Sequence, residues 1–295
     1  MISDNNPVWT LPFGEQAELL LESDVVPVSL IPLNPGDEPR LVLSGEDADR
    51  VEVEVHRQGD RVRVRVRRQG HPHFSFGNSD ALVSLFVPAQ ISASIHADAG
   101  SIAASGFGPC ELELTTDAGR ISIRDSNGHL RLSTDAGLIE GRNLGPCHLE
   151  MRTDAGRISL EEAHGQMRLS SSAGKITGER LSGSIDAQTD VGSIRLGIAG
   201  LTPGSHRVRT SAGSIRIDLA PDLDVKVVTA AGLGSAKSSY PSRSNSETVL
   251  HVSADLGSVK VRAAEVEMPR GARQGIQRHV EDVRSAVAAG FSHVP

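Results

Sequence analysis

A short motif that ends in glycine recurs along most of the chain and limits the possible fold more than any other feature. The tetrapeptide TDAG occurs three times, ending at Gly119, Gly137 and Gly156. Degenerate copies end at Gly100, Gly174, Gly192, Gly213, Gly232 and Gly257. Most copies are 18 or 19 residues apart. A unit of this length is too short for a helix-bearing repeat and fits one coil of a stacked β-structure.

Apolar residues stand at constant positions around each glycine. An aliphatic residue follows two positions later in every copy except the one at Gly232, where Gly234 takes that place. Apolar pairs precede the glycine by seven and five positions, as Leu112 and Leu114 do before Gly119. A spacing of two residues predicts strands with one buried face. We therefore expect an all-β fold, a single-stranded parallel β-solenoid of about nine coils in sequential order, wound right-handed.

Charged residues six positions before the glycine alternate in sign. They are Glu113, Arg131, Glu150, Arg168, Asp186 and Arg207. Only in-register parallel stacking places these side chains next to one another, and opposite charges on neighbouring strands are stabilising. The alternation therefore supports the coil register and is typical of a structural ladder.

The segment before the repeats is β-patterned but lacks the motif. Residues 1–97 are expected to form a β-rich N-terminal cap, followed by the solenoid repeats of residues 98–262. Within the cap, residues 51–67 predict a hairpin with a turn at Gly59–Asp60 that pairs Glu54 with Arg65 and Glu52 with Arg67. The same register places four valines on one buried face: Val53, Val55, Val64 and Val66. A cap is expected because an open solenoid end exposes a sheet edge.

The segment after the repeats, residues 263–295, changes its periodicity. Apolar residues recur there at helical spacing, at Ile276, Val280, Val283, Val287 and Phe291. This pattern predicts an amphipathic helix. The helix is expected either to cap the last coil or to dock a protein partner or a second copy of the chain. The polar stretch Tyr240–Glu247 is expected to be an insertion before the last coil.

Aspartates two positions before the glycine form the most suggestive column of polar residues. Asp98 leads it, followed by the candidate cation ligands Asp117, Asp135 and Asp154. Stacked carboxylates can bind Ca²⁺. The column then becomes irregular, and aspartate before a glycine corner commonly accepts backbone N–H bonds in an Asx turn. We favour the corner role, with hydroxyl-to-backbone bonds from the adjacent Thr and Ser column, and expect no bound metal or other cofactor.

Histidines and cysteines form two further columns. Glu111, His129, His148 and Gln166 stand eight positions before the glycine, where a surface ladder is favoured over a transition-metal site. Cys110 and Cys147 occupy the same position two coils apart, a separation of about 9–10 Å. A disulfide needs its Cα atoms within about 7 Å. Two free thiols are therefore expected, with His148 on the face opposite to Cys147.

Composition excludes several classes of function. The formal net charge is −7, and the aromatic residues are six Phe, one Tyr and one Trp. A nucleic-acid binder needs clustered cations and stacking platforms, so no nucleic-acid partner is expected. The chain contains no Walker, Rossmann, nucleophile-elbow or zincin motif, which argues against an enzyme. It also contains no signal-peptide pattern and no apolar stretch of about 20 residues, so we expect a cytoplasmic protein without a membrane span.

The motifs also resemble a known family. The hairpin VEVEV/RVRVRV, the segment LVSLFVPAQISASIHADAGSI and the coils TDAGRISI and TSAGSIRI resemble the bacterial putative-adhesin family of unknown function, over roughly residues 40–262. The resemblance implies a β-solenoid and no catalytic residues. We expect a non-enzymatic scaffold that binds a protein partner. A self-assembling filament protein like the bactofilins and a carbohydrate-binding β-helix remain alternatives.

Overall fold

The fold is all-β, as predicted. The computed structural model describes residues 6–14, 17–69 and 81–270. The elements assigned there are strands and one 3-10 turn: β1 (Val8–Thr10), β2 (Glu18–Ser23), β3 (Val28–Pro32), β4 (Arg40–Ser44), η1 (Ala48–Arg50), β5 (Val51–Gln58), β6 (Arg61–Arg68), β7 (Leu82–Val87), β8 (Ser92–Ser105), β9 (Cys110–Leu201), β10 (Gly204–Leu219), β11 (Lys226–Ser238) and β12 (Thr248–Ala263). The expected helix over Ile276–Phe291 lies outside the described residues.

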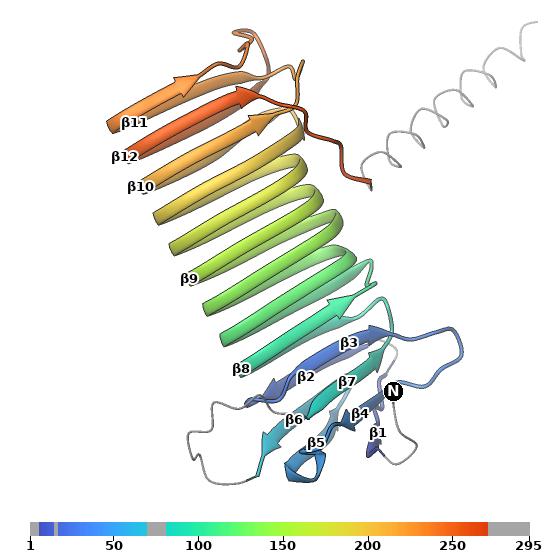
Figure 1. Cartoon of the computed structure of the whole chain (residues 1–295). Coiled ribbons are helices and arrows are strands. Elements are labelled where there is room, and N and C mark those ends of the chain that lie inside the picture. The colour runs from blue at the N-terminus through green and yellow to red at the C-terminus, as the bar shows by residue number, and fades with distance from the viewer. Residues whose placement is uncertain (1–5, 15–16, 70–80, 271–295) are drawn as a thin grey trace, which may run out of the picture.

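The middle of the molecule is a stack of parallel coils (Figure 1). Strand β8 pairs in parallel with the start of β9, with Gly100 opposite Gly119 and Ile102 opposite Ile121. The long strand β9 winds back on itself several times, and its last coil pairs with β10 in the same register. Equivalent positions of successive repeats therefore lie next to each other on neighbouring strands, as the 18–19-residue period predicts.

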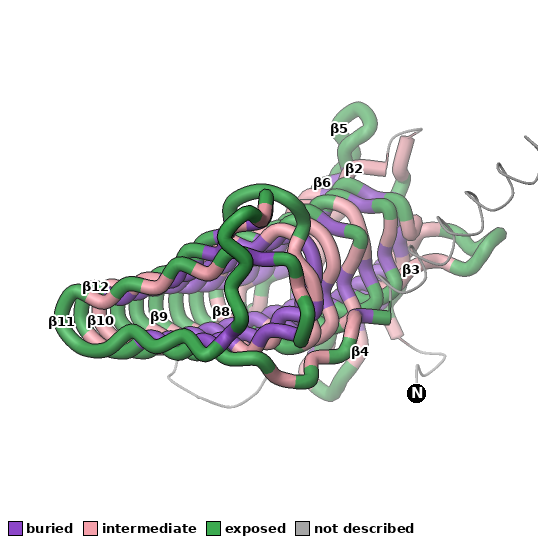
Figure 2. The backbone as a smooth tube through the Cα atoms, turned by 90° about the horizontal axis from the view of Figure 1, so that it is seen from above, coloured by how far each residue is buried: buried purple, intermediate pink, exposed green. Residues whose placement is uncertain are grey.

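Four coils of β9 turn at three corners, of which the sequence reveals only two. The motif glycine and a second glycine, such as Gly165 with φ of +133°, mark the first two. The third corner is held by Asp125, Asn143, Glu162 and Arg180, whose φ angles lie between +49° and +57°. Because these are not glycines, the pattern of the sequence did not show this corner. Buried aliphatic side chains fill a narrow core between the corners, and the buried positions along the backbone are purple in Figure 2.

Parallel stacking continues into the N-terminal region, but not in chain order. Strand β2 pairs in parallel with β8 on one side and with β6 on the other. Strand β3 likewise pairs in parallel with β8 and with β7. Strands β2 and β3 come early in the chain and therefore lie between strands that come later. Antiparallel strands β5, β4 and β1 complete this end.

The predicted hairpin is present with the expected register. Glu54 lies opposite Arg65, and Glu52 lies opposite Arg67. Val64 and Val66 are fully buried, whereas Val53 and Val55 are only partly buried. The difference arises because β6 is covered by β2 on its other side, while β5 pairs with β6 alone.

The C-terminal coils are also out of chain order, which corrects the expectation of sequential stacking. Strand β12 pairs with β10 on one side and with β11 on the other. Strand β11 is therefore the last layer of the stack (Figure 1). The register also corrects the motif assignment: Gly234, and not Gly232, lies opposite Gly257. A shift of two residues keeps every side chain on the same face, so alternation alone could not distinguish the two glycines.

The residues of β11 suit a terminal layer. Its inward positions carry Val227, Thr229, Ala231, Ala236 and Ser238. The paired positions of β12, which has a neighbour on each side, carry Leu250, Val252, Ala254, Val259 and Val261. Small and polar residues are stable on β11 because one side of this layer has no further strand. The segment 239–247 crosses this end, where the buried Tyr240 donates its hydroxyl hydrogen to the carbonyl oxygen of Ala220 or Leu223.

Among the described residues, no helix has the length and apolar character needed to span a membrane.

Candidate functional site

The outward face of the strand that precedes the motif glycine carries most of the candidate residues; we call it the polar face. The alternating charges lie there in one row: Glu113, Arg131, Glu150, Arg168, Asp186 and Arg207. A shallow groove of about 790 Å³ runs along this row and extends to Glu18 and Arg61 of the N-terminal strands. The stacking of coils therefore turns a periodic sequence pattern into a continuous polar surface.

Ion pairs form in only part of this row. Arg131 lies 3.8 Å from a carboxylate oxygen of Glu113 and 3.5 Å from one of Glu150. Arg168 and Arg207 form no ion pair with a described residue. The Arg131 side chain is 64% exposed, so these pairs contribute little to stability and leave the charges accessible to a partner.

Two histidines of the histidine column stack on each other. The rings of His129 and His148 lie 4.7 Å apart, centroid to centroid, at an interplanar angle of 18°. This arrangement gives the polar face a flat surface near its N-terminal half.

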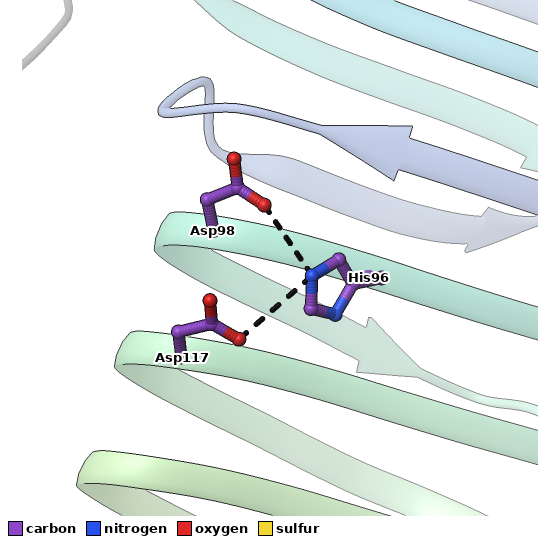
Figure 3. A group of neighbouring side chains, drawn as sticks. All are labelled: His96, Asp98 and Asp117. Carbon is purple, nitrogen blue, oxygen red and sulfur yellow. Dashed lines mark ion pairs between the residues drawn. The ribbon is translucent and has the colours of Figure 1, made fainter.

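Two residues of the aspartate column, Asp98 and Asp117, join His96 in a cluster that can accept a cation (Figure 3). The ligand atoms of His96, Asp98 and Asp117 lie within 4.8 Å of one another. His96 Nε2 is 3.3 Å from Asp98 Oδ1 and 3.8 Å from Asp117 Oδ1. The three side chains are 43%, 64% and 57% exposed. His96 Nε2 therefore lies within ion-pair distance of both carboxylates, and all three groups are open to solvent.

Asp135 and Asp154 do not join this cluster. Asp154 lies 3.5 Å from an Arg152 guanidinium nitrogen. Asp98, Asp117 and Asp154 thus point outward and pair with side chains, which is not the Asx-turn role that we expected.

The neighbouring hydroxyl column also differs from expectation. Thr189 donates a hydrogen bond to the carbonyl oxygen of Val191 at 3.4 Å. The other buried hydroxyls of the column have no partner among the described residues: Thr116, Thr134, Thr153, Ser171 and Thr210. These side chains face the core, where the next hydroxyl of the stack is about 4.8 Å away. That distance exceeds the reach of a hydrogen bond.

The two cysteines are free and buried. Burial raises the pKa of the Cys110 thiol to about 11 and that of the Cys147 thiol to about 12. Both thiols are therefore protonated at neutral pH and are poor nucleophiles. His148 is exposed on the opposite face from Cys147, as strand alternation predicts.

One buried histidine was not identified from the sequence. His206 occupies a core position of β10 and is 1% exposed. Its Nδ1 accepts a hydrogen bond from the Ile185 N–H at 3.2 Å, and its Nε2 donates to the Thr202 carbonyl oxygen at 2.8 Å. Burial lowers the pKa of this ring. The sequence did carry one signal for this histidine: Gly192 and Gly213 are 21 residues apart, whereas most motif glycines are 18 or 19 apart. A longer connection leaves backbone groups that need a hydrogen-bond partner.

No family model and no curated protein matches the chain. The chain is similar to a structure named a putative adhesin from Bacteroides fragilis, at 13% identity and a TM-score of 0.46, over 88% of this chain and 98% of that one. It is also similar to a putative cell adhesion protein from Clostridium sporogenes, at 10% identity and a TM-score of 0.22, over 88% and 99%.

Proposed function

We propose that this chain is a non-enzymatic β-solenoid scaffold of the adhesin type, and that it binds a protein partner along its polar face. The observation that carries the proposal is the long, shallow groove lined by both signs of charge. A flat surface with alternating charge favours recognition by charge complementarity, which sets orientation and partner choice.

Two further observations support a role without catalysis. The thiols of Cys110 and Cys147 are held protonated by burial. His206 is enclosed by the core with both ring nitrogens engaged by the backbone. The groups most suited to nucleophilic or acid–base chemistry thus serve the packing of the stack.

The experiment compares two charge-reversed baits in affinity purification from the native cell. Arg168→Glu with Arg207→Glu alters the polar face, and Arg124→Glu with Arg157→Glu makes the same charge change on another face. We expect proteins that co-purify with the wild-type chain and the control to be depleted from the polar-face variant. Equal recovery with all three baits would contradict the proposal.

A self-assembling filament is the second candidate, favoured by the terminal strand β11, which pairs with β12 alone. The antiparallel strands at the other end argue against head-to-tail growth, because they offer no matching parallel edge. Negative-stain microscopy over a concentration series distinguishes the two: the scaffold predicts single short rods, and long filaments would exclude it. A glycan array tests the carbohydrate-binding alternative, for which the scaffold predicts no signal.

A further inference from the structure

The glycine corner changes character over the last four layers of the stack. We call this region the C-terminal edge: the coil that contains Gly192, followed by β10, β12 and β11. In earlier coils the residue just before the motif glycine is alanine, as at Ala118 and Ala155. At the C-terminal edge this column reads Val191, Ala212, Leu256 and Leu233 in spatial order.

These larger aliphatic residues are exposed. The exposed fraction is 58% for Val191, 50% for Leu256 and 71% for Leu233. Leu256 and Leu233 are direct partners on β12 and β11. Single exposed aliphatic residues are common and need no explanation. A row of them along one straight corner, where other coils carry alanine, is an apolar ridge.

A column of cations runs beside this ridge over the same four layers. Three positions after the motif glycine, the residues are Arg195, Arg216, Lys260 and Lys237. Earlier coils carry Ser122, Glu140 and Ser159 at that position. The column contrasts with the polar face, because stacked charges of one sign repel and destabilise a sheet. Such a column is stable when an external anion neutralises it.

Within the part of the chain that the structure describes, carboxylates do not pair with these cations. None of the four forms an ion pair with a described residue. The carboxylate of Asp218, two residues after Arg216, is bound by Arg262. All four cationic side chains are exposed, and their charge is directed to solvent.

Hydroxyl groups lie between the ridge and the cations. Ser193, Ser214, Ser258 and Ser235 form this column. Together with the cations and Lys175 they line a hollow of about 420 Å³. Hydroxyl and ammonium or guanidinium donors around a small hollow suit a phosphate group. The C-terminal edge therefore offers an apolar row, a hydroxyl row and a cationic row in parallel.

We propose that the C-terminal edge is a docking surface for an anionic lipid bilayer. A bilayer surface supplies both complementary chemistries at once, since apolar residues enter the acyl boundary while Lys and Arg approach lipid phosphates. An extended acidic peptide fits less well, because its same-face side chains repeat at about 6.8 Å and the layers of the stack at about 4.8 Å. A soluble polyanion would leave the leucines exposed.

Vesicle co-sedimentation of the full chain tests the proposal. The probes are vesicles of phosphatidylcholine alone and of an equal mixture with phosphatidylglycerol. We expect binding to the mixed vesicles only, weakened by salt because exposed charges are screened. Arg216→Glu with Lys260→Glu should weaken binding at least about tenfold, and Leu233→Ser with Leu256→Ser should weaken it to a similar extent.

The matched control is Arg124→Glu with Arg157→Glu, which reverses two exposed arginines in the middle of the stack and should leave vesicle binding within about twofold of wild type. Four results would overturn the proposal. The first is absence of binding to mixed vesicles. The second is wild-type binding by the leucine variant. The third is full competition by soluble polygalacturonate, which would reveal a site for free polyanions. The fourth is a change of oligomeric state in the leucine variant, which would assign the ridge to a second copy of the chain.

Discussion

At the scale of single residues, the motif glycines are required by the close approach of neighbouring coils. A Cβ atom on Gly156 would lie well inside van der Waals contact of the carbonyl oxygen of Gly137. The same clash recurs from layer to layer, for example between Gly174 and Gly156. The obstacle is backbone, which cannot move aside as a flexible side chain can. This explains why glycine is the most constant residue of the motif.

Gly156→Ala should therefore reduce the free energy of unfolding by about 3 kcal/mol, the upper range for overpacking. Urea denaturation followed by circular dichroism measures this change. Gly197→Ala is the matched control, because the nearest atom to its added Cβ would be 3.7 Å away, in ordinary contact. Similar losses in both variants would show that backbone approach is not the cause.

The buried His206 should make the free energy of unfolding depend on pH. Its pKa is lowered in the folded state by burial, so the unfolded chain binds a proton that the folded chain does not. Stability from this group is present above the ordinary pKa of about 6.5 and is lost as the pH falls below it. The free energy of unfolding should decrease between pH 7.5 and pH 5.5 with a steeper slope in the wild type than in His206→Gln.

The substitution also removes an acceptor from the Ile185 N–H, which should cost about 1–3 kcal/mol at neutral pH. Urea titrations at several pH values measure both effects. Identical slopes in the two proteins would rule out His206 as a source of the pH dependence, whatever the cost at neutral pH.

At the scale of elements, the order of the last three strands is the least expected result. Ser258 of β12 pairs with Ser214 of β10 and with Ser235 of β11. Ser214 and Ser235 are therefore two layers apart. Chain order would instead make them neighbours, so engineered cysteines can distinguish the two arrangements.

Ser214→Cys with Ser258→Cys should form a disulfide under mild oxidation, because adjacent layers are about 4.8 Å apart. Ser214→Cys with Ser235→Cys should not, because about 9.6 Å separates these layers and the limit is about 7 Å. Mass spectrometry and non-reducing gels report the bond. The native thiols are buried and do not compete. A disulfide in the second variant alone would contradict the observed order.

At the scale of the whole molecule, the protein is a rod in which each layer mainly contacts its two neighbours (Figure 1). Stability in such a stack is approximately a sum over layers and their interfaces. At each end of the rod, the layers are out of chain order. At the N-terminal end, β2 and β3 lie between β8 and the strands β6 and β7, and at the C-terminal end β12 lies between β10 and β11. The two ends nevertheless differ, since antiparallel strands complete only the first.

A buried charge in the middle of the rod should weaken it strongly. Ile158 is fully buried, so Ile158→Asp should cost several kcal/mol, about 3 or more, through an unpaired carboxylate. Arg131→Glu, on the exposed polar face, should cost less than about 1 kcal/mol. Thermal unfolding compares the two variants. An unchanged melting temperature for Ile158→Asp would mean that the coil register is wrong.

The amino-acid sequence alone determined the all-β class, the coil period, the hairpin register and the inward position of the aliphatic columns. These follow from local rules, because alternation with period two and glycine corners are written in neighbouring residues. The same rules identified the charge row of the polar face and the separate thiols of Cys110 and Cys147.

Only the tertiary structure decided which layers are neighbours at each end. Parallel pairing depends on long-range contacts, and a two-residue shift such as Gly232 for Gly234 leaves the alternation unchanged. The left-handed corner at Asp125, the unpaired hydroxyl of Thr116 and the partners of His206 depend equally on neighbours that are distant in sequence. For the same reason the C-terminal edge was hidden: Lys260 and Leu256 join their columns because β12 enters between β10 and β11.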